Sequence, residues 1–137
     1  MSADLTDGQD VGGCRILAVV GSGGMGIIYR AEQRSLGRVV ALKVIRPQIS
    51  AAADYRARFL REAQLAAAVN HPHVVTVYDV GEDAGRLYLI MQWVDGTDLR
   101  KMLERDGRFA PGRAVRLARS LQAPSGRSTR WDWCTGT

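Results

Sequence analysis

The chain has 137 residues, of which 46% are hydrophobic and 24% charged, a composition that is ordinary for one globular domain. Two cysteines are too few for a disulfide framework, and no apolar run is long enough to span a membrane. The net charge of +5 does not indicate nucleic-acid binding, because residues 1–98 hold ten basic and eleven acidic side chains, whereas residues 99–137 hold nine and three. We therefore expect a cytoplasmic protein without a membrane segment in this chain and without a nucleic-acid partner.

A glycine-rich turn is the first feature along the chain that suggests chemistry. Residues 1–12 are polar and are expected to be a flexible lead-in. The turn, which we call the glycine turn, consists of Gly21, Ser22, Gly23, Gly24, Met25 and Gly26. It fits G-x-G-x-x-G, a pattern that dinucleotide sites also use before a helix. Here residues 27–32 begin with two isoleucines and then alternate, which predicts a strand and hence a hairpin. Glycines let such a turn lie against phosphate oxygens, although a turn without a ligand is the alternative.

A lone lysine lies in the apolar run that follows. The chain has seventeen arginines and two lysines, Lys43 and Lys101, and Lys43 is in the middle of the predicted strand 39–45. A charge there is costly unless it is paired. Lysine is a compact charge on a flexible stem, suited to reaching phosphate oxygens. A lysine that extends from an edge strand into solvent is the alternative.

The next segment supplies an anion for this lysine. Residues 54–69 contain good helix formers and neither glycine nor proline, and Asp54 is the expected N-cap. Glu62 is the one carboxylate on the apolar stripe of this helix. We expect Glu62 to face Lys43, and an exposed pair between Glu62 and Arg58 is the alternative.

From about Cys14 to Arg119 the chain resembles the N-terminal, ATP-binding lobe of a bacterial eukaryotic-like serine/threonine protein kinase. The motifs that carry the resemblance, in chain order, are residues 21–29, 40–45, 58–63, 70–81 and 87–96. The resemblance implies an α+β fold with a five-stranded antiparallel sheet and one main helix. The implied divisions are the lead-in (1–12), the N-lobe with its hinge (13–96), the beginning of a C-lobe (97–122) and an aberrant, disordered tail (123–137).

The resemblance also implies a role for each site residue. Val20, Ile28 and Ala41 would enclose the adenine of ATP, and the glycine turn would cover the phosphates. Lys43 would hold the α- and β-phosphates, oriented by Glu62. Met91 occupies the gatekeeper position, and the backbones of Gln92 and Val94 would bind the adenine edge, so that the side chains of these two residues matter little. The family hinge more often has Glu and Tyr where this chain has Gln92 and Trp93, and both side chains would point away from the ligand. Asp98 would meet a ribose hydroxyl, or would instead stabilise the first turn of the next helix.

The remaining site expectations concern metals and partners. His71 and His73 lie two residues apart without a cysteine or carboxylate cluster nearby, so we interpret both as structural and expect no metal ligands. The family uses ATP with Mg²⁺ and a protein substrate. Neither His-Arg-Asp nor Asp-Phe-Gly occurs in these residues, so the aspartate that accepts the hydroxyl proton and the Mg²⁺ ligands are missing. We therefore expect this truncated chain to be inactive. A non-catalytic interaction module and a non-functional gene fragment are the alternatives.

The tail has a specific predicted origin. Helices are expected at residues 99–105 and from residue 111 to 121, but residues 123–137 contain a breaker pair and no helical stripe. Residues 131–137 must be encoded TGG-GAY-TGG-TGY-ACN-GGN-ACN. Shifting the frame by two bases forces Gly-Leu-Val and permits His-Arg-Asp directly after it. A frameshift in a kinase gene predicts that the Cys134 codon ends in C, the Thr135 codon in A or C and the Gly136 codon in G, which the gene sequence tests.

Overall fold

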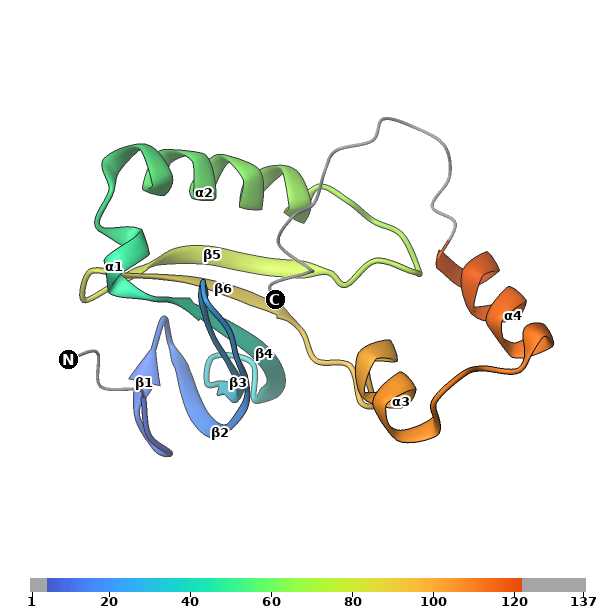
Figure 1. The fold of residues 1–137 in the computed structure, drawn as a ribbon. Helices are drawn as coiled ribbons and strands as arrows, with labels where there is room; N and C mark the ends of the chain where they lie inside the picture. Colours follow the sequence, from blue (N-terminus) through green and yellow to red (C-terminus); the bar gives the residue numbers. More distant parts are fainter. Residues whose placement is uncertain (1–4, 122–137) are drawn as a thin grey trace. The chain divides into compact units, whose positions relative to one another are not determined.

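The computed structural model describes residues 5–121 (Figure 1). These residues form two compact units, a first unit of residues 5–93 and a second unit of residues 94–121. The division lies three residues before the expected end of the N-lobe at residue 96. The tail at residues 123–137 lies outside the described residues, so its expected frameshift origin stays a prediction.

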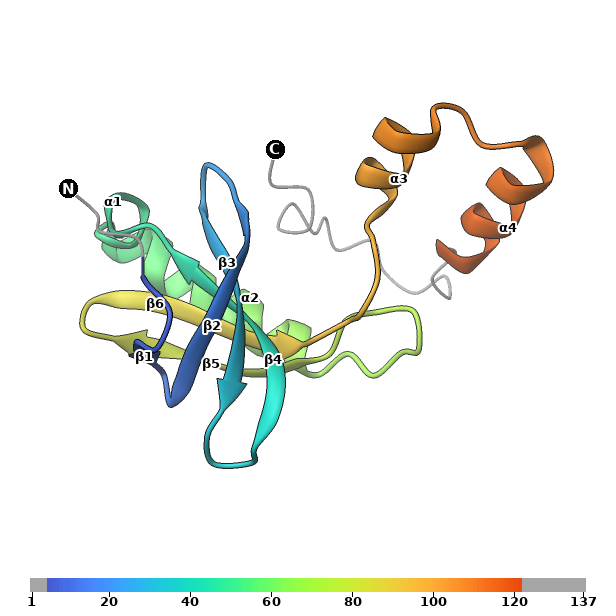
Figure 2. The same cartoon turned by 90° about the horizontal axis from the view of Figure 1, so that it is seen from below.

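A six-stranded antiparallel sheet forms the body of the first unit (Figures 1 and 2). The strands, in the spatial order β1-β2-β3-β4-β6-β5, are β1 (Asp10–Val11), β2 (Cys14–Ser22), β3 (Gly26–Gln33), β4 (Arg38–Ile45), β5 (Val77–Asp83) and β6 (Arg86–Gln92). The five longer strands confirm the expected α+β class and its antiparallel sheet. The two-residue β1 is an addition that the sequence did not predict.

Two helices belong to the first unit, α1 (Pro47–Ser50) and α2 (Ala53–Ala67). The main helix is confirmed, but the expected N-cap is wrong, because Ala52 occupies that position and Asp54 lies inside the first turn. The short α1, which begins at a proline, precedes α2, and the N-cap of α2 lies two residues earlier than expected. In Figure 1, α2 lies along the part of the sheet that β5 and β6 form.

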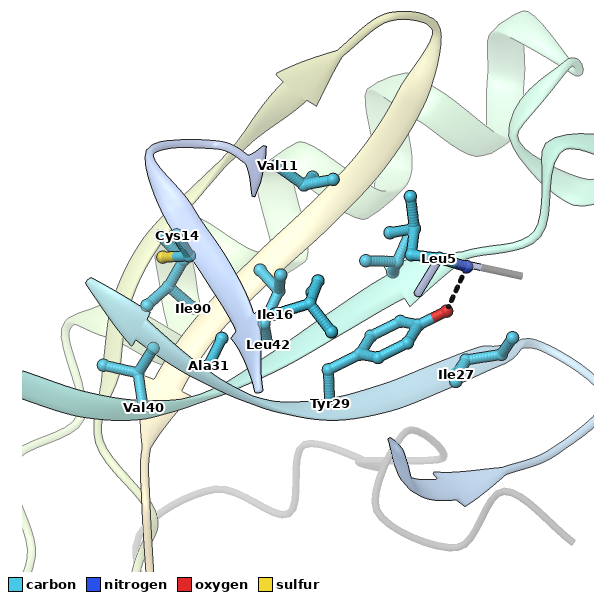
Figure 3. Close-up of a cluster of buried hydrophobic side chains, with 11 residues drawn as sticks. Leu5, Val11, Cys14, Ile16, Ile27, Tyr29, Ala31, Val40, Leu42 and Ile90 are labelled. Atoms are coloured by element: carbon cyan, nitrogen blue, oxygen red, sulfur yellow. Dashed lines mark hydrogen bonds between the residues drawn. The ribbon is translucent and has the colours of Figure 1, made fainter. Parts of the chain in front are cut away.

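Alternation along the strands produces two buried clusters on opposite faces of the sheet. On one face, Val40, Leu42 and Ile90 pack with residues of β1, β2 and β3 (Figure 3). On the other face, Leu89 packs with Ile45 and the buried side of α2. Successive side chains of a strand point to opposite faces, which explains why neighbours on β4 and β6 belong to different clusters.

The segment expected to be a flexible lead-in is folded from residue 5 onward. Leu5 is buried, and its N–H donates to the hydroxyl of Tyr29 at 3.1 Å (Figure 3). The N–H of Gly12 donates to Asp83 Oδ2 at 2.8 Å, although β1 and β5 are the opposite edges of the sheet. This contact curls the sheet into a half-barrel. The packing of Leu5 and the hydrogen bond of Gly12 to a strand 71 positions away, neither of which a local pattern reveals, therefore hold residues 5–12 in place.

The second unit contains α3 (Leu99–Asp106) and α4 (Pro111–Leu121), close to the bounds that the sequence predicted. Helix α3 begins at Asp98, whose Oδ1 accepts the Lys101 N–H at 2.8 Å, and ends at Gly107 with φ +72°. No residue of α3 is buried. Over the described residues 5–121, no helix has the length and apolarity needed to cross a bilayer.

Candidate functional site

The glycine turn joins β2 and β3 as a hairpin, as the sequence predicted. The Gly23 N–H donates to the Gly26 carbonyl at 2.9 Å and closes the turn. Gly26 is buried against β4, where an added Cβ would overlap the Val44 carbonyl and lie 3.1 Å from its carbon. An added Cβ on Gly21 or Gly24 would meet no atom within 4 Å. The turn is therefore packed at its base and open at its tip.

The strand that leads into the turn carries an irregularity at the expected adenine residue. Val19 pairs with Tyr29 and Gly21 pairs with Ile28, so the register shifts at Val20. The Val20 side chain is 42% exposed. Bulges of this kind re-aim a side chain, and they are common next to binding sites.

Four of the expected site residues lie on one face of the sheet. Lys43 of β4 pairs with Ile28 of β3 on one side and with Leu89 of β6 on the other. Ala41, two residues before Lys43, pairs with Met91. Directly paired residues point to the same side of a sheet, and so do residues two apart on one strand. The register therefore brings Ile28, Ala41, Lys43 and Met91 together on one surface.

Helix α2 covers this same face. Ile45, two residues after Lys43, is buried with Phe59 and Ala63 of α2. Glu62 is half-buried on α2, next to Ala63. The pairing of Glu62 with Lys43 stays a prediction.

The end of β6 has a backbone and a side-chain contact that the sequence did not reveal. The Gln92 N–H donates to the Thr76 carbonyl at 2.8 Å, and Gln92 Oε1 accepts the Thr76 N–H at 3.3 Å. The Arg30 guanidinium lies 5.6 Å from the centroid of the Trp93 ring. The side chains of Gln92 and Trp93 therefore contact residues at the end of the strand, and their expected orientation away from the ligand stays a prediction.

The two remaining expected residues belong to the second unit. Val94 is 59% exposed, and Asp98 caps α3. The capping alternative for Asp98 is confirmed by its hydrogen bond to the Lys101 N–H. Its expected contact with a ribose stays a prediction.

The other candidate side chains have structural surroundings. The His73 N–H donates to His71 Nδ1 at 3.1 Å, and the two rings meet edge to face. Between residues 5 and 121, no three histidine, cysteine or acidic side chains gather in a way that could hold a metal ion. Burial, with a smaller contribution from Asp79, raises the pKa of the Cys14 thiol, which makes Cys14 unsuited to act as a nucleophile.

One residue near the site was missed at the sequence level. Arg46 directly follows β4, and its side chain donates to the Gly23 carbonyl at 3.2 Å and to Ser22 Oγ at 3.0 Å. A single arginine among seventeen gives no signal in the sequence. The one available clue is its position, directly after the strand that pairs with the base of the glycine turn.

Comparisons with known proteins agree on one family. The family described as "Protein kinase domain" matches residues 14–123. The chain is 42% identical over 120 residues to the serine/threonine-protein kinase PknE of Mycobacterium bovis, an alignment that covers 88% of this chain and 21% of that protein. It is 48% identical over 99 residues to PknF of Mycobacterium tuberculosis, covering 72% of this chain and 21% of PknF.

Solved structures give the same result for the fold. The PknI kinase domain of Mycobacterium tuberculosis superimposes with a TM-score of 0.74 at 32% identity, and the superposition covers 86% of this chain and 48% of that structure. The chain thus spans about half of that kinase domain and about a fifth of the curated relatives it matches. The family match at residues 14–123 includes the strands that carry the paired face and the glycine turn.

Proposed function

The chain belongs to the protein kinase family, and from this premise we propose that its first unit binds ATP as the nucleotide-binding lobe of a serine/threonine kinase. One observation carries the proposal: Ile28, Ala41, Lys43 and Met91 share one sheet face, in register, beside a hairpin turn of the G-x-G-x-x-G type. A flat apolar surface with one cation and a glycine backbone at its edge suits a purine nucleotide with phosphates.

The proposed roles follow from chemistry at each position. Val20, Ile28 and Ala41 provide the apolar contact for the adenine ring, and Met91 limits its depth. The ammonium group of Lys43 attracts the α- and β-phosphates, and Glu62 on the covering helix orients it. The N–H of Gln92 donates to the Thr76 carbonyl, and the proposed role of the Gln92 carbonyl is to accept a hydrogen bond from the adenine amino group.

The family positions of Val94 and Asp98 give these two residues proposed roles as well. The backbone of Val94 would bind the other polar atoms of the adenine edge. The Asp98 carboxylate uses Oδ1 to cap α3, and its Oδ2, which lies 3.9 Å from the Lys101 ammonium group, would accept a ribose hydroxyl. When Mg²⁺ accompanies ATP it neutralises phosphate charge, but the described residues offer it no ligand cluster, so we assign no step to it.

We propose that these 137 residues alone transfer no phosphoryl group. The family reaction moves the terminal phosphoryl group of ATP to a serine or threonine hydroxyl of a protein substrate. It needs an aspartate that positions the hydroxyl, and the His-Arg-Asp motif that carries it does not occur in this sequence. ATP is abundant in the cytoplasm, where we place this lobe.

A calorimetric titration with ATP tests the proposal, with the two lysines as a matched pair. We expect weak binding by the 137-residue chain and a loss of at least about tenfold in Lys43→Ala, since a charge-assisted hydrogen bond contributes about 1.5–3 kcal/mol. Lys101→Ala removes the same charge from α3 and should leave the affinity unchanged. Equal losses in both variants would show non-specific charge attraction and would refute the assigned site.

An interaction module is the second candidate, and one observation favours it. In the second unit, Leu103 is 46% exposed and Val115 is 52% exposed, although both helices have one apolar side. Such a side normally packs against another element. If interaction is the function, Lys43→Ala should change neither the oligomeric state of the chain nor its binding of a partner. The chain should then self-associate or bind another protein through α4.

A further inference from the structure

Arg46, directly after β4, forms hydrogen bonds with the glycine turn. We propose that Arg46 is a positioning residue that keeps the turn in the conformation that receives phosphate groups. This inference rests on the ATP binding proposed above. The Arg46 side chain would not itself touch the nucleotide. Its effect on affinity would be limited to the binding of the phosphate groups.

Three hydrogen bonds connect Arg46 with three residues of the turn. Its backbone N–H donates to the Met25 carbonyl at 3.0 Å. Its Nε donates to the Gly23 carbonyl at 3.2 Å, and its Nη2 donates to Ser22 Oγ at 3.0 Å. The contacts therefore reach both arms of the hairpin, one side of the turn through the side chain and the other through the backbone.

The base from which Arg46 reaches the turn is itself fixed. Arg46 is the N-cap of α1, and its carbonyl accepts the N–H groups of Ile49 at 2.9 Å and Ser50 at 3.1 Å. Pro47 follows, and its ring limits the backbone. The Ser50 carbonyl in turn accepts a hydrogen bond from Arg56 of α2 at 3.4 Å. The backbone of Arg46 is therefore fixed by hydrogen bonds within α1, and α1 is connected to α2 through the bond between Ser50 and Arg56.

The hydrogen bond from Arg46 to the Gly23 carbonyl determines which backbone groups of the turn face a bound anion. The peptide bond is planar and trans, so the Gly23 carbonyl and the Gly24 N–H point in opposite directions. A carbonyl oxygen repels a phosphate, whereas an N–H attracts it. By holding the carbonyl, Arg46 fixes the direction of the Gly24 N–H as well.

The composition of the turn explains why such a contact is needed. Four of its six residues are glycine, and glycine has the largest backbone freedom of any residue. At the tip, an added Cβ at Gly24 would meet nothing within 4 Å, so packing does not restrict the backbone there. Hydrogen bonds from Arg46 supply the restriction. A guanidinium can donate to two acceptors in a fixed fork, which an ammonium group on a flexible stem does less well.

The test uses two variants of Arg46 and one control in the 137-residue chain. Arg46→Met removes both side-chain hydrogen bonds and keeps the apolar stem and the backbone N–H. Arg46→Lys keeps the charge but not the fork. Arg61→Met removes an equal charge from the exposed side of α2 and is the control. Circular dichroism establishes that each variant is folded.

Two measurements distinguish the effect of Arg46 on the turn itself from its effect on nucleotide binding. The first is amide hydrogen exchange of Gly23 without any ligand, since its N–H closes the turn. The second is the dissociation constant for ATP and for adenosine, measured by NMR titration. Adenosine has no phosphates, so its affinity reports the apolar face alone.

We expect Arg46→Met to raise the Gly23 exchange rate about tenfold and to weaken ATP about tenfold without changing adenosine, the size expected from losing a charge-assisted hydrogen bond. Arg46→Lys should recover part of both effects, and Arg61→Met should match wild type. An Arg46→Met protein that matches Arg61→Met in both readouts would overturn the inference, as would equal losses for ATP and adenosine. A wild-type chain that binds neither ligand would refute the proposed function, and the exchange rate would then decide by itself whether Arg46 holds the turn.

Discussion

The two units of this chain differ in how far they bury their apolar side chains. Every buried hydrophobic residue of the described chain lies between Leu5 and Ile90, within the first unit. The second unit forms two amphipathic helices, yet α3 buries no residue, and Leu103 and Val115 remain about half exposed. An amphipathic pattern therefore predicts that a helix forms, but it does not show which part of the molecule covers its apolar side. The candidate ATP face depends on the unit that has its own core.

The largest loss of stability is expected at the base of the glycine turn. In Gly26→Ala the new methyl group would overlap the Val44 backbone of β4, which cannot move without breaking strand pairing. We expect a loss of about 2–3 kcal/mol in the free energy of unfolding, the range for overpacking a tight site. Urea denaturation measures it. Gly24→Ala, where no atom lies within 4 Å, should change stability by less than about 0.5 kcal/mol. Equal effects in the two variants would show that the turn is not packed against β4.

A smaller effect, a difference of about 1 kcal/mol between two glycine variants, is expected where the half-barrel closes. Gly12 has φ +58°, and an added Cβ would lie 2.5 Å from the Tyr88 ring. Gly13 has φ +75° with open space around it. Both alanine variants carry backbone strain of about 1–2 kcal/mol, but Gly12→Ala should lose about 1 kcal/mol more because of the ring. Thermal unfolding of the two variants measures the difference. Identical melting temperatures would mean that residues 5–12 are not part of the first unit's cooperative core.

The smallest effect is expected in the second unit. Asp98→Ala removes the cap of α3 and should destabilise that helix by about 1 kcal/mol. Asp98→Asn keeps an oxygen that can accept the Lys101 N–H and should retain the helix. The amide chemical shifts of residues 99–106 report the helix, and urea denaturation reports the first unit. If Asp98→Ala lowered the unfolding free energy of the first unit as much as Gly26→Ala does, the two regions would form one cooperative structure.

Local patterns in the sequence were sufficient to predict the elements that build the candidate site. Alternation and the glycine spacing predicted the hairpin, and the lone lysine identified the strand whose register brings Ile28 and Met91 to the same face. These features are local, because a strand's two faces follow from its own residues.

Contacts between distant residues could not be predicted in this way. The hydrogen bond from Gly12 to Asp83 spans 71 positions, and the bonds from Arg46 to Ser22 and Gly23 span more than twenty. The mistaken cap at Asp54 has a related cause, since the direction of the chain leaving α1 determined where α2 begins. Whether Glu62 meets Lys43 likewise depends on how the helix is seated on the sheet, and it stays a prediction.

Amide hydrogen exchange over the whole 137-residue chain tests the central claim most directly, because it measures both units in one sample. The account predicts that amides of β2, β3, β4, β6 and α2 exchange at least about a hundredfold more slowly than unfolded peptides, while those of α3 and α4 are slowed less than about tenfold. Added ATP should slow exchange at the glycine turn and at the end of β6. Protection in α3 and α4 equal to that in β4, or an ATP effect confined to the second unit, would contradict the claim that the first unit folds around its own core and carries the nucleotide-binding face.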